Sequence, residues 1–430
     1  MTGLRRHLVS AGLLFAALGA LVAPYFMWRH VHQPVVYPAP PREMLDSGLS
    51  WKKSEIGQTK SAEPRITNVQ IVDYDGDGRN DVLVCDPQRN AVLCYLQTAA
   101  GWQEQVLAKD LLAPAHATLV DIDGDGDRDL VVSELGEVWP SDAVIGRLIL
   151  LENTGEGGGF RQHVLLDAVR RVADAQPGDF DGDGDIDLAV AVFGYARGEV
   201  LWLENLSDSK FREHRLWSRP GAIHVPVADF DQDGDLDIAT VISQDDEEVL
   251  AFENDGRGNF KPRTLFSTLN FDLGSAGLVL CDLDRDGDSD LLLPAGDNLE
   301  ENYAWPQPYH GCFWLENQGG WKFETRRIGT FGSTYAAAAG DLDADGDQDV
   351  VLVSLMNDWS DPNVPSVVWL ENDGRQQFQL RPVDKTPTHL ITVACGDLNG
   401  DGRDDIVAGG MHLRPPFDRT GRVTGWISKP

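Results

Sequence analysis

Seven short loops crowded with aspartate recur along this chain of 430 residues. Each loop spans nine residues, with an oxygen-bearing side chain at positions 1, 3, 5 and 9 and glycine at position 6. The side chains at positions 1, 3, 5 and 9 are, loop by loop, Asp73, Asp75, Asp77 and Asp81; Asp121, Asp123, Asp125 and Asp129; Asp179, Asp181, Asp183 and Asp187; Asp229, Asp231, Asp233 and Asp237; Asp282, Asp284, Asp286 and Asp290; Asp341, Asp343, Asp345 and Asp349; and Asp397, Asn399, Asp401 and Asp405.

This concentration of negative charge predicts a bound divalent cation. Carboxylates so close together repel one another by roughly several kcal/mol per close pair, even at a surface-like dielectric. Calcium is the natural ligand, because it accepts about six to eight oxygens in a flexible geometry. The glycine lets the chain turn sharply around an ion. The alternative is an unliganded acidic turn, and it has the most weight for the loop that contains Asn399.

The loops differ from EF-hands in what surrounds them. An EF-hand requires a glutamate at position 12 and a helix on each side. Here position 12 is apolar, as at Val84, Val132 and Val190. Short runs of β-branched and apolar residues precede and follow each loop, without helical periodicity. Each loop is therefore expected to join two β-strands.

The acidic loops mark a longer repeat. Their first residues are 48, 58, 50, 53, 59 and 56 positions apart, a period typical of solenoids and propellers. A third strand ending in Glu-Asn and a fourth strand beginning with an aromatic residue follow most loops, which makes four strands per unit, as in a propeller blade. The Glu-Asn pairs are Glu152-Asn153, Glu204-Asn205, Glu253-Asn254, Glu316-Asn317 and Glu371-Asn372.

The two ends of the repeat predict how the ring closes. The last unit stops at the strand around Trp426 and lacks a fourth strand, while an isolated strand, Trp51–Ile56, precedes the first unit. We therefore predict an all-β fold, a seven-bladed β-propeller with four-stranded blades. The N-terminal strand would complete the last blade, because closure removes exposed sheet edges.

These repeats resemble the FG-GAP and VCBS repeats of integrin-type propellers and of many secreted or membrane-anchored bacterial proteins. The resemblance extends from Trp51 to Trp426 and implies a calcium-loaded propeller with up to seven ions, used for adhesion, ligand binding or, in some members, catalysis. By analogy with related loops, the four side chains would bind calcium together with the backbone carbonyl at position 7, which belongs to Arg79, Asp127, Asp185, Asp235, Asp288, Asp347 and Arg403.

The N-terminal segment predicts a membrane connection. Residues 1–28 hold an uncharged apolar stretch, Leu8–Trp28, about long enough to span a bilayer. We expect an uncleaved signal anchor, with a cleaved signal peptide as the alternative, followed by a Pro-rich linker over 29–50 and the propeller over 51–430. Either interpretation places the propeller outside the cytoplasm, in the periplasm, at the cell surface or secreted.

Charge and cysteine content narrow the possible partners. The formal net charge is −33, which argues against nucleic-acid binding because that function needs a basic surface. Cys85 and Cys94 are expected on adjacent strands of the first blade. The sequence allows either a disulfide between them or two free thiols. Cys281 and Cys395 precede acidic loops and are expected to be buried, inert thiols.

Long loops on the face opposite the acidic loops are candidates for ligand binding. They lie within 134–146, 295–311, 354–366 and 409–425. Their aromatic, amide and charged side chains suit a sugar, although aromatic residues also simply stiffen long loops. The candidates are Trp139, Asp297, Asn298, Tyr303, Trp305, Tyr309, His310, Asn357, Trp359, His412 and Arg414.

A second candidate site lies where the innermost strands begin. His116, Asp174 and His224 each stand five residues before the first aspartate of a loop, and Asn68 has the same place in the first blade. Equivalent positions on neighbouring blades would meet at one mouth of the central channel. Such residues could hold a transition metal, act as acid and base, or merely face a wet channel.

No nucleophile motif, phosphate-binding loop or dinucleotide fingerprint occurs in the sequence. We therefore expect an extracytoplasmic calcium-binding propeller that acts as a ligand-binding or protein-interaction scaffold, with a carbohydrate or an adhesion partner as its ligand. The alternative is a polysaccharide-active, lyase-like enzyme that uses the histidines and the aspartate of the channel mouth.

Overall fold

The computed structural model describes residues 44–57, 63–139, 141–155, 159–207, 209–244, 246–297 and 306–429. These residues form strands and connecting loops without a helix, so none of the described segments is a helix that could span a membrane. The predicted signal anchor, expected to be a single hydrophobic helix within residues 1–28, and most of the Pro-rich linker lie outside the described residues.

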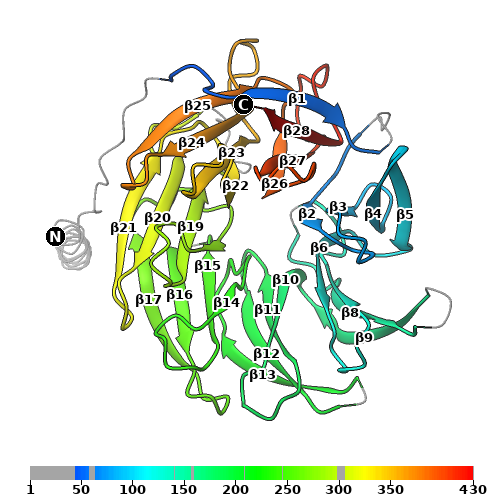
Figure 1. Cartoon of the computed structure of the whole chain (residues 1–430). Coiled ribbons are helices and arrows are strands. Elements are labelled where there is room, and N and C mark those ends of the chain that lie inside the picture. Colours follow the sequence, from blue (N-terminus) through cyan, green and yellow to red (C-terminus); the bar gives the residue numbers. More distant parts are fainter. Residues whose placement is uncertain are drawn as a thin grey trace, which may run out of the picture.

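The described part of the chain forms a ring of seven four-stranded sheets in which neighbouring strands are antiparallel (Figure 1). The first three blades are β2 (Asn68–Val72), β3 (Asp81–Asp86), β4 (Ala91–Thr98) and β5 (Gly101–Ala108); β6 (Pro114–Val120), β7 (Asp129–Glu134), β8 (Gly146–Asn153) and β9 (Phe160–Val169); and β10 (Arg171–Gly178), β11 (Asp187–Phe193), β12 (Glu199–Asn205) and β13 (Phe211–Trp217).

The remaining four blades repeat the same strand order. They are β14 (Val227–Ala228), β15 (Asp237–Ile242), β16 (Glu247–Glu253) and β17 (Lys261–Thr268); β18 (Val279–Cys281), β19 (Asp290–Ala295), β20 (Gly311–Asn317) and β21 (Phe323–Gly329); β22 (Thr334–Gly340), β23 (Asp349–Ser354), β24 (Val367–Asn372) and β25 (Phe378–Asp384); and β26 (Leu390–Gly396), β27 (Asp405–Gly410), β28 (Val423–Lys429) and β1 (Ser50–Glu55). The all-β, seven-bladed prediction is confirmed.

The first strand of each blade lies toward the centre of the ring. Figure 1 shows β2, β6, β10, β14, β22 and β26 around the central opening, and β2 contacts β26 while β6 contacts β10. Each acidic loop joins the first strand of a blade to its second strand. The acidic loops and the beginnings of the innermost strands therefore lie at opposite ends of the central channel.

The hydrophobic core lies between adjacent blades, which explains the uninterrupted apolar runs in the sequence. Every residue of the second strands β3 and β7 is buried, because a blade packs against a neighbour on each of its two faces. Between the last and the first blade, for example, Val407 and Val423 pack with Val82 and Leu93 in one cluster.

The N-terminal strand closes the ring, as predicted. β1 pairs antiparallel with β28, placing Trp51 opposite Ser428. The N–H of Ile56 donates to the carbonyl of Val423 at 3.0 Å, and its side chain is only 1% exposed within the cluster between the two end blades. The two ends of the propeller are thus joined both by β-sheet hydrogen bonds and by apolar packing.

The glycine at position 6 of each acidic loop is required by backbone conformation. Its φ ranges from 83° at Gly78 to 100° at Gly234, a region that residues with a Cβ rarely adopt. A Cβ on Gly78 would meet no atom within 4 Å, so space does not restrict this position. The recurrent glycine is therefore a requirement of the turn itself.

Removal of the N-terminal strand should destabilise the ring. A chain that begins at residue 44 contains β1 and Ile56, whereas a chain that begins at residue 63 lacks both. The shorter chain should melt at a lower temperature or aggregate, because the edge of β28 is left unpaired. Within the full chain, Ile56→Ala should cost about 2–5 kcal/mol of unfolding free energy. The matched change Lys52→Ala, at an exposed position of β1, should cost little. Equal melting temperatures for the two shortened chains would contradict this closure.

Candidate functional site

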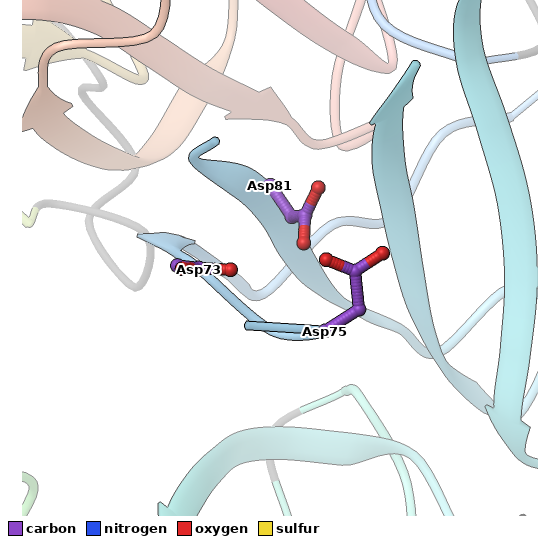
Figure 2. Close-up of side chains that lie close together, drawn as sticks. All are labelled: Asp73, Asp75 and Asp81. Carbon is purple, nitrogen blue, oxygen red and sulfur yellow. The ribbon is translucent and has the colours of Figure 1, made fainter. Parts of the chain in front are cut away.

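The acidic loops bring the carboxylates of positions 1, 3 and 9 together. In the first loop, Asp73, Asp75 and Asp81 each offer an oxygen within 4.8 Å of the others, and Figure 2 shows these side chains around one small space. The same grouping occurs at Asp121, Asp123 and Asp129; Asp179, Asp181 and Asp187; Asp229, Asp231 and Asp237; and Asp282, Asp284 and Asp290. These clusters could hold metal ions.

The side chains at positions 1 and 5 also organise the backbone of the loop. Asp73 accepts the N–H of Gly78 at 3.0 Å, and Asp77 accepts the N–H of Arg79 at 2.9 Å. Asp77, predicted as a ligand, is not part of the three-carboxylate group of its loop. The loop is therefore shaped by its own hydrogen bonds, with positions 1, 3 and 9 converging most closely.

The aspartate at position 9 connects the loop to the third strand of its blade. Asp187 accepts the N–H of Phe180, in the loop, at 3.2 Å and the N–H of Asn205, at the end of β12, at 2.7 Å. All seven copies make this pair of hydrogen bonds: Asp81 with Tyr74 and Gln97, Asp129 with Ile122 and Asn153, Asp237 with Phe230 and Asn254, Asp290 with Leu283 and Asn317, Asp349 with Leu342 and Asn372, and Asp405 with Leu398 and Ser428.

The Glu-Asn motif of the third strand has two structural roles. In the third, fourth and fifth blades the asparagine side chain reaches the acidic loop of the preceding blade, as where Asn254 donates to the carbonyl of Phe180 at 2.8 Å. The glutamate faces the fourth strand, where Glu204 lies 2.6 Å from a ring nitrogen of His214. In these three blades the motif therefore joins the blade to the loop beside it and to its own outer strand.

Adjacent acidic loops are also hydrogen-bonded directly through position 8. The Asn80 side chain donates to the carbonyl of Asp397 at 2.7 Å, and Arg128 donates to the carbonyl of Asp73 at 2.8 Å. The N–H of Asp404 donates to the carbonyl of Asp341 at 2.9 Å. Because each contact ends at the first residue of the preceding loop, the shape of one loop constrains the next.

The carboxylates of position 9 are buried, and their pKa values respond to that burial. Burial raises the pKa of Asp237 to about 7 and that of Asp349 to about 8. The two backbone N–H groups that each carboxylate accepts oppose this increase, while the other aspartates of the loop add to it. Without a counter-ion, the ionised form of these groups is therefore destabilised.

The loops contain unsatisfied acceptors that a cation would satisfy. Buried carboxylate oxygens of Asp121, Asp231, Asp284 and Asp341 have no hydrogen-bond partner in the described structure. Each belongs to position 1 or position 3, two of the positions whose oxygens converge. Leaving a buried acceptor unpaired costs free energy, so the donor set fits a hard, oxygen-binding metal ion.

The structure brings the three predicted channel-mouth residues into contact. His116 on β6 places Nδ1 3.3 Å from Asp174 on β10, and His224, just before β14, places Nδ1 3.6 Å from the other oxygen of the same carboxylate. Asp174 also accepts the N–H of Val225 at 3.0 Å. Three successive blades thus meet at one buried carboxylate.

The charge of Asp174 is stabilised by this arrangement. Burial alone would raise the pKa of Asp174, but His116, His224 and the Val225 N–H outweigh that effect and lower it. For His116, burial lowers the pKa and Asp174 only partly offsets the decrease. Because both histidines direct Nδ1 toward Asp174, the Nε2 atom of each ring is the one left to contact a ligand.

A cavity of about 750 Å³ opens at this mouth of the channel. His116, Asp174 and His224 line it, together with residues that become neighbours only in the folded ring. The cavity combines aromatic surface with charged and polar groups, the composition of a small-molecule site. The additional lining residues include Asn68, Trp139, Arg171, Tyr195, Glu247, Phe271, Asp297 and Tyr335.

The other predicted ligand residues have varied surroundings. Trp139 and Asp297 line the cavity, whereas His310, Trp359, His412 and Arg414 do not. His310 is fully buried, and its Nδ1 accepts the N–H groups of Gln307 and Ser333, which assigns that nitrogen a structural role. Trp359 is buried, and the Asn357 side chain donates to the carbonyl of Gly332. The rings of His412 and Tyr309 contact neighbouring rings, those of Phe417 and His310 respectively. Asn298, Tyr303 and Trp305 lie outside the described residues.

The possible disulfide of the first blade is not formed. Cys85 and Cys94 are buried free thiols, because Cys85 faces Val92 across the sheet while Cys94 faces Leu83. Cys281 and Cys395 are also free, but they are only partly buried, contrary to the expectation of full burial. Burial raises the pKa of all four thiols, consistent with the expected inert character of Cys281 and Cys395.

Replacement of a position-9 aspartate should destabilise its blade. Asp237→Asn keeps the size of the side chain but turns an amide N–H₂ toward one of two backbone N–H donors. This change should cost about 1–3 kcal/mol of unfolding free energy, measured by denaturant unfolding. The matched change Asp233→Asn, in the same loop but exposed, should cost less in the absence of divalent ions. Equal effects of the two changes would contradict the connecting role of position 9.

Comparison with known proteins identifies the repeat. The family model described as an FG-GAP-like repeat matches residues 73–132, 179–240, 229–293 and 345–408, more than half of the chain. The matched segments begin at or within acidic loops and extend through the strands that follow. No curated protein matches the chain in sequence.

Two solved structures are similar to this chain at low sequence identity. BBS1N, from its complex with ARL6DN, is 10% identical with a TM-score of 0.52, over 89% of this chain and 98% of that one. Rhamnogalacturonan lyase YesW is 16% identical with a TM-score of 0.44, over 92% of this chain and 74% of that one. The first likeness supports the fold alone, and the second is too distant to support an argument. On the evidence of its repeats, the chain belongs to the FG-GAP-like repeat family.

Proposed function

We propose that this protein is an extracytoplasmic, calcium-stabilised propeller that binds a carbohydrate at the mouth of its central channel. The observation that carries the proposal is the cavity of about 750 Å³ at the end of the channel opposite the acidic loops. In this scheme one end of the ring binds ions that hold the blades, and the other end binds the ligand.

Two observations support calcium as the ion. The converging ligands are all carboxylate oxygens, a donor set that favours hard cations over transition metals. Several of these oxygens are buried without a hydrogen-bond partner, which costs free energy. A bound cation would coordinate these oxygens and so remove that cost. The predicted backbone carbonyl at position 7 would complete the coordination.

The lining of the cavity supports a sugar as the ligand. Trp139 and Phe271 are 43% and 59% exposed, and the Arg65 guanidinium lies over one face of Trp139, so the exposed ring surface that remains is where a sugar ring can stack. Asn68, Asp297 and Glu247 supply hydrogen-bonding groups in the same cavity. A pyranose presents both an apolar face and hydroxyl groups, and this combination of side chains complements both.

The sequence supports a location outside the cytoplasm. The apolar segment Leu8–Trp28 is long enough for a signal anchor, and the net charge of −33 suits loops that bind calcium at the concentrations found outside cells. We propose that the propeller is tethered to a membrane by this segment or released by its cleavage.

An enzyme is the second candidate function, and one contact favours it. Asp174 holds His116 and His224 by their Nδ1 atoms, so two imidazoles with oriented Nε2 atoms share one cavity. One neutral and one protonated imidazole could act as base and acid on a bound glycan. Binding without turnover would favour the scaffold, and product formation that depends on His116 would favour the enzyme.

Calcium should stabilise the ring. The full chain should melt at a higher temperature in calcium than in EGTA, because each site adds about 2.7 kcal/mol at a hundredfold excess of ion over its dissociation constant. Asp284→Asn should weaken one site and lower the calorimetric stoichiometry by about one at moderate calcium, whereas the exposed Asp167→Asn, outside the loops, should not. Equal melting temperatures in calcium and EGTA would refute the role of calcium.

Glycan binding should depend on the aromatic rim of the cavity. A glycan array probed with the calcium-loaded protein should identify at least one sugar, and Trp139→Ala should weaken its binding about tenfold through lost stacking. The change Leu112→Ala, at an apolar side chain 41% exposed and outside the cavity lining, is the control. Mass spectrometry of any bound sugar after incubation then separates binding from turnover. An array without a hit would contradict the proposal.

A further inference from the structure

Arg171 differs from the other deeply buried arginine of the ring. It begins β10, lines the channel-mouth cavity and is only 9% exposed. One guanidinium nitrogen donates to the carbonyl of Val138 at 3.0 Å, while Nε has no hydrogen-bond partner in the described structure. The Tyr195 hydroxyl is a further hydrogen-bond partner of the guanidinium, and none of the described carboxylates lies within ion-pair distance of Arg171.

Arg422 shows how this protein otherwise accommodates a buried guanidinium. Its side chain is 5% exposed, and its guanidinium pairs with Asp86 at 2.5 Å and also contacts the Tyr95 hydroxyl. Burial by itself would lower the pKa of Arg422, but Asp86 and Tyr95 outweigh burial and raise it. A buried charge with such a partner avoids most of the desolvation penalty.

Arg171 lacks that compensation. Burial lowers its pKa, and Tyr195, Tyr335 and the exposed carboxylate of Glu137 offset the decrease only in part. The guanidinium also lies 5.4 Å from the centre of the Phe193 ring, an attraction weaker than an ion pair. The protein thus maintains an incompletely compensated cation at the wall of the channel-mouth cavity, which is costly unless a ligand provides the counter-charge.

The other charged groups around the cavity do not act as the counter-charge of Arg171. Asp174 is engaged by two histidines and by a backbone N–H. Glu247 accepts the N–H groups of Gly274 and Ser275, both at 3.2 Å, and burial raises its pKa to about 7. Asp272 and Asp297 belong to the fifth blade and its approach, two blades away from Arg171 along the ring.

We propose that the cavity binds an acidic sugar, a uronate, whose carboxylate pairs with the guanidinium of Arg171. This inference rests on the proposed carbohydrate-binding function and deepens it by naming the ligand class. A guanidinium presents parallel N–H donors that match the two oxygens of a carboxylate, and a desolvated pair of this kind is strong. The aromatic rim would contact the sugar ring while Arg171 selects its charge.

The test compares acidic and neutral forms of one sugar. Trigalacturonate and trimannuronate, each with its methyl ester, are titrated calorimetrically into the full protein at fixed free calcium. At least one free acid should bind about tenfold or more tightly than its ester. Arg171→Gln should weaken binding of the free acid about tenfold and weaken ester binding less, which removes the preference. Arg171→Lys, which keeps the charge but lacks the planar fork, should retain part of it.

Arg215→Gln is the matched control, because Arg215 belongs to the same blade, is 54% exposed and pairs with Glu199 away from the cavity. Melting curves of all variants show whether a change in binding reflects a loss of fold. Equal binding of acid and ester, or a preference that survives Arg171→Gln in a folded protein, overturns the uronate proposal while the carbohydrate function stands. If neither uronate binds, the uronate proposal is also overturned. The proposed carbohydrate-binding function would be contradicted only by a glycan array without any hit.

Discussion

A buried carboxylate at the ninth position of every acidic loop holds the blades of this propeller in shape. Asp187 shows the arrangement, since one of its oxygens accepts an N–H from the loop and the other accepts an N–H from the end of the third strand. The first, second and third strands of the blade are thus fixed relative to one another at one point. Because such a group is buried, its negative charge carries a desolvation penalty that neutral hydrogen bonds only partly offset.

That penalty connects the architecture to metal binding. The carboxylate at position 9 belongs to the same group of oxygens as positions 1 and 3, so a bound cation would stabilise the charge that the blade needs for its geometry. Position 8 and the asparagine of the third strand extend the effect to the neighbouring blade, as in the contacts of Asn80 with Asp397 and of Asn254 with Phe180. The carboxylate that would bind an ion and the carboxylate that holds the blade are therefore the same group.

The opposite end of the channel has different requirements. The innermost strands begin there, and the long loops between second and third strands lie at the same end, away from the acidic loops. At this mouth the structure gathers His116, Asp174 and His224 from three blades, with Arg171 on the same strand as Asp174. A rigid ring holds such groups with little loss of conformational entropy on binding, which is why scaffolds of this kind suit ligand recognition.

The sequence by itself determined the repeat, the number of blades, the acidic clusters and the closure by the strand containing Trp51. Each of these depends on local pattern: aspartate spacing, a glycine required at positive φ, and apolar runs of strand length. The triad of His116, Asp174 and His224 was also predictable, because equivalent positions in a closed repeat must converge on the axis.

Only the tertiary structure decided what the remaining residues do. Position 9 could be predicted as a metal ligand, but its hydrogen bond to the third strand depends on where that strand ends relative to the loop. His310 belonged to a promising loop, yet the fold buries it against backbone N–H groups. Arg171 carried no local signal, because its importance lies in the absence of an ion-pair partner among the described residues that surround it. Burial and pairing of charges are properties of neighbours brought together by folding, and spacing along the chain does not encode them.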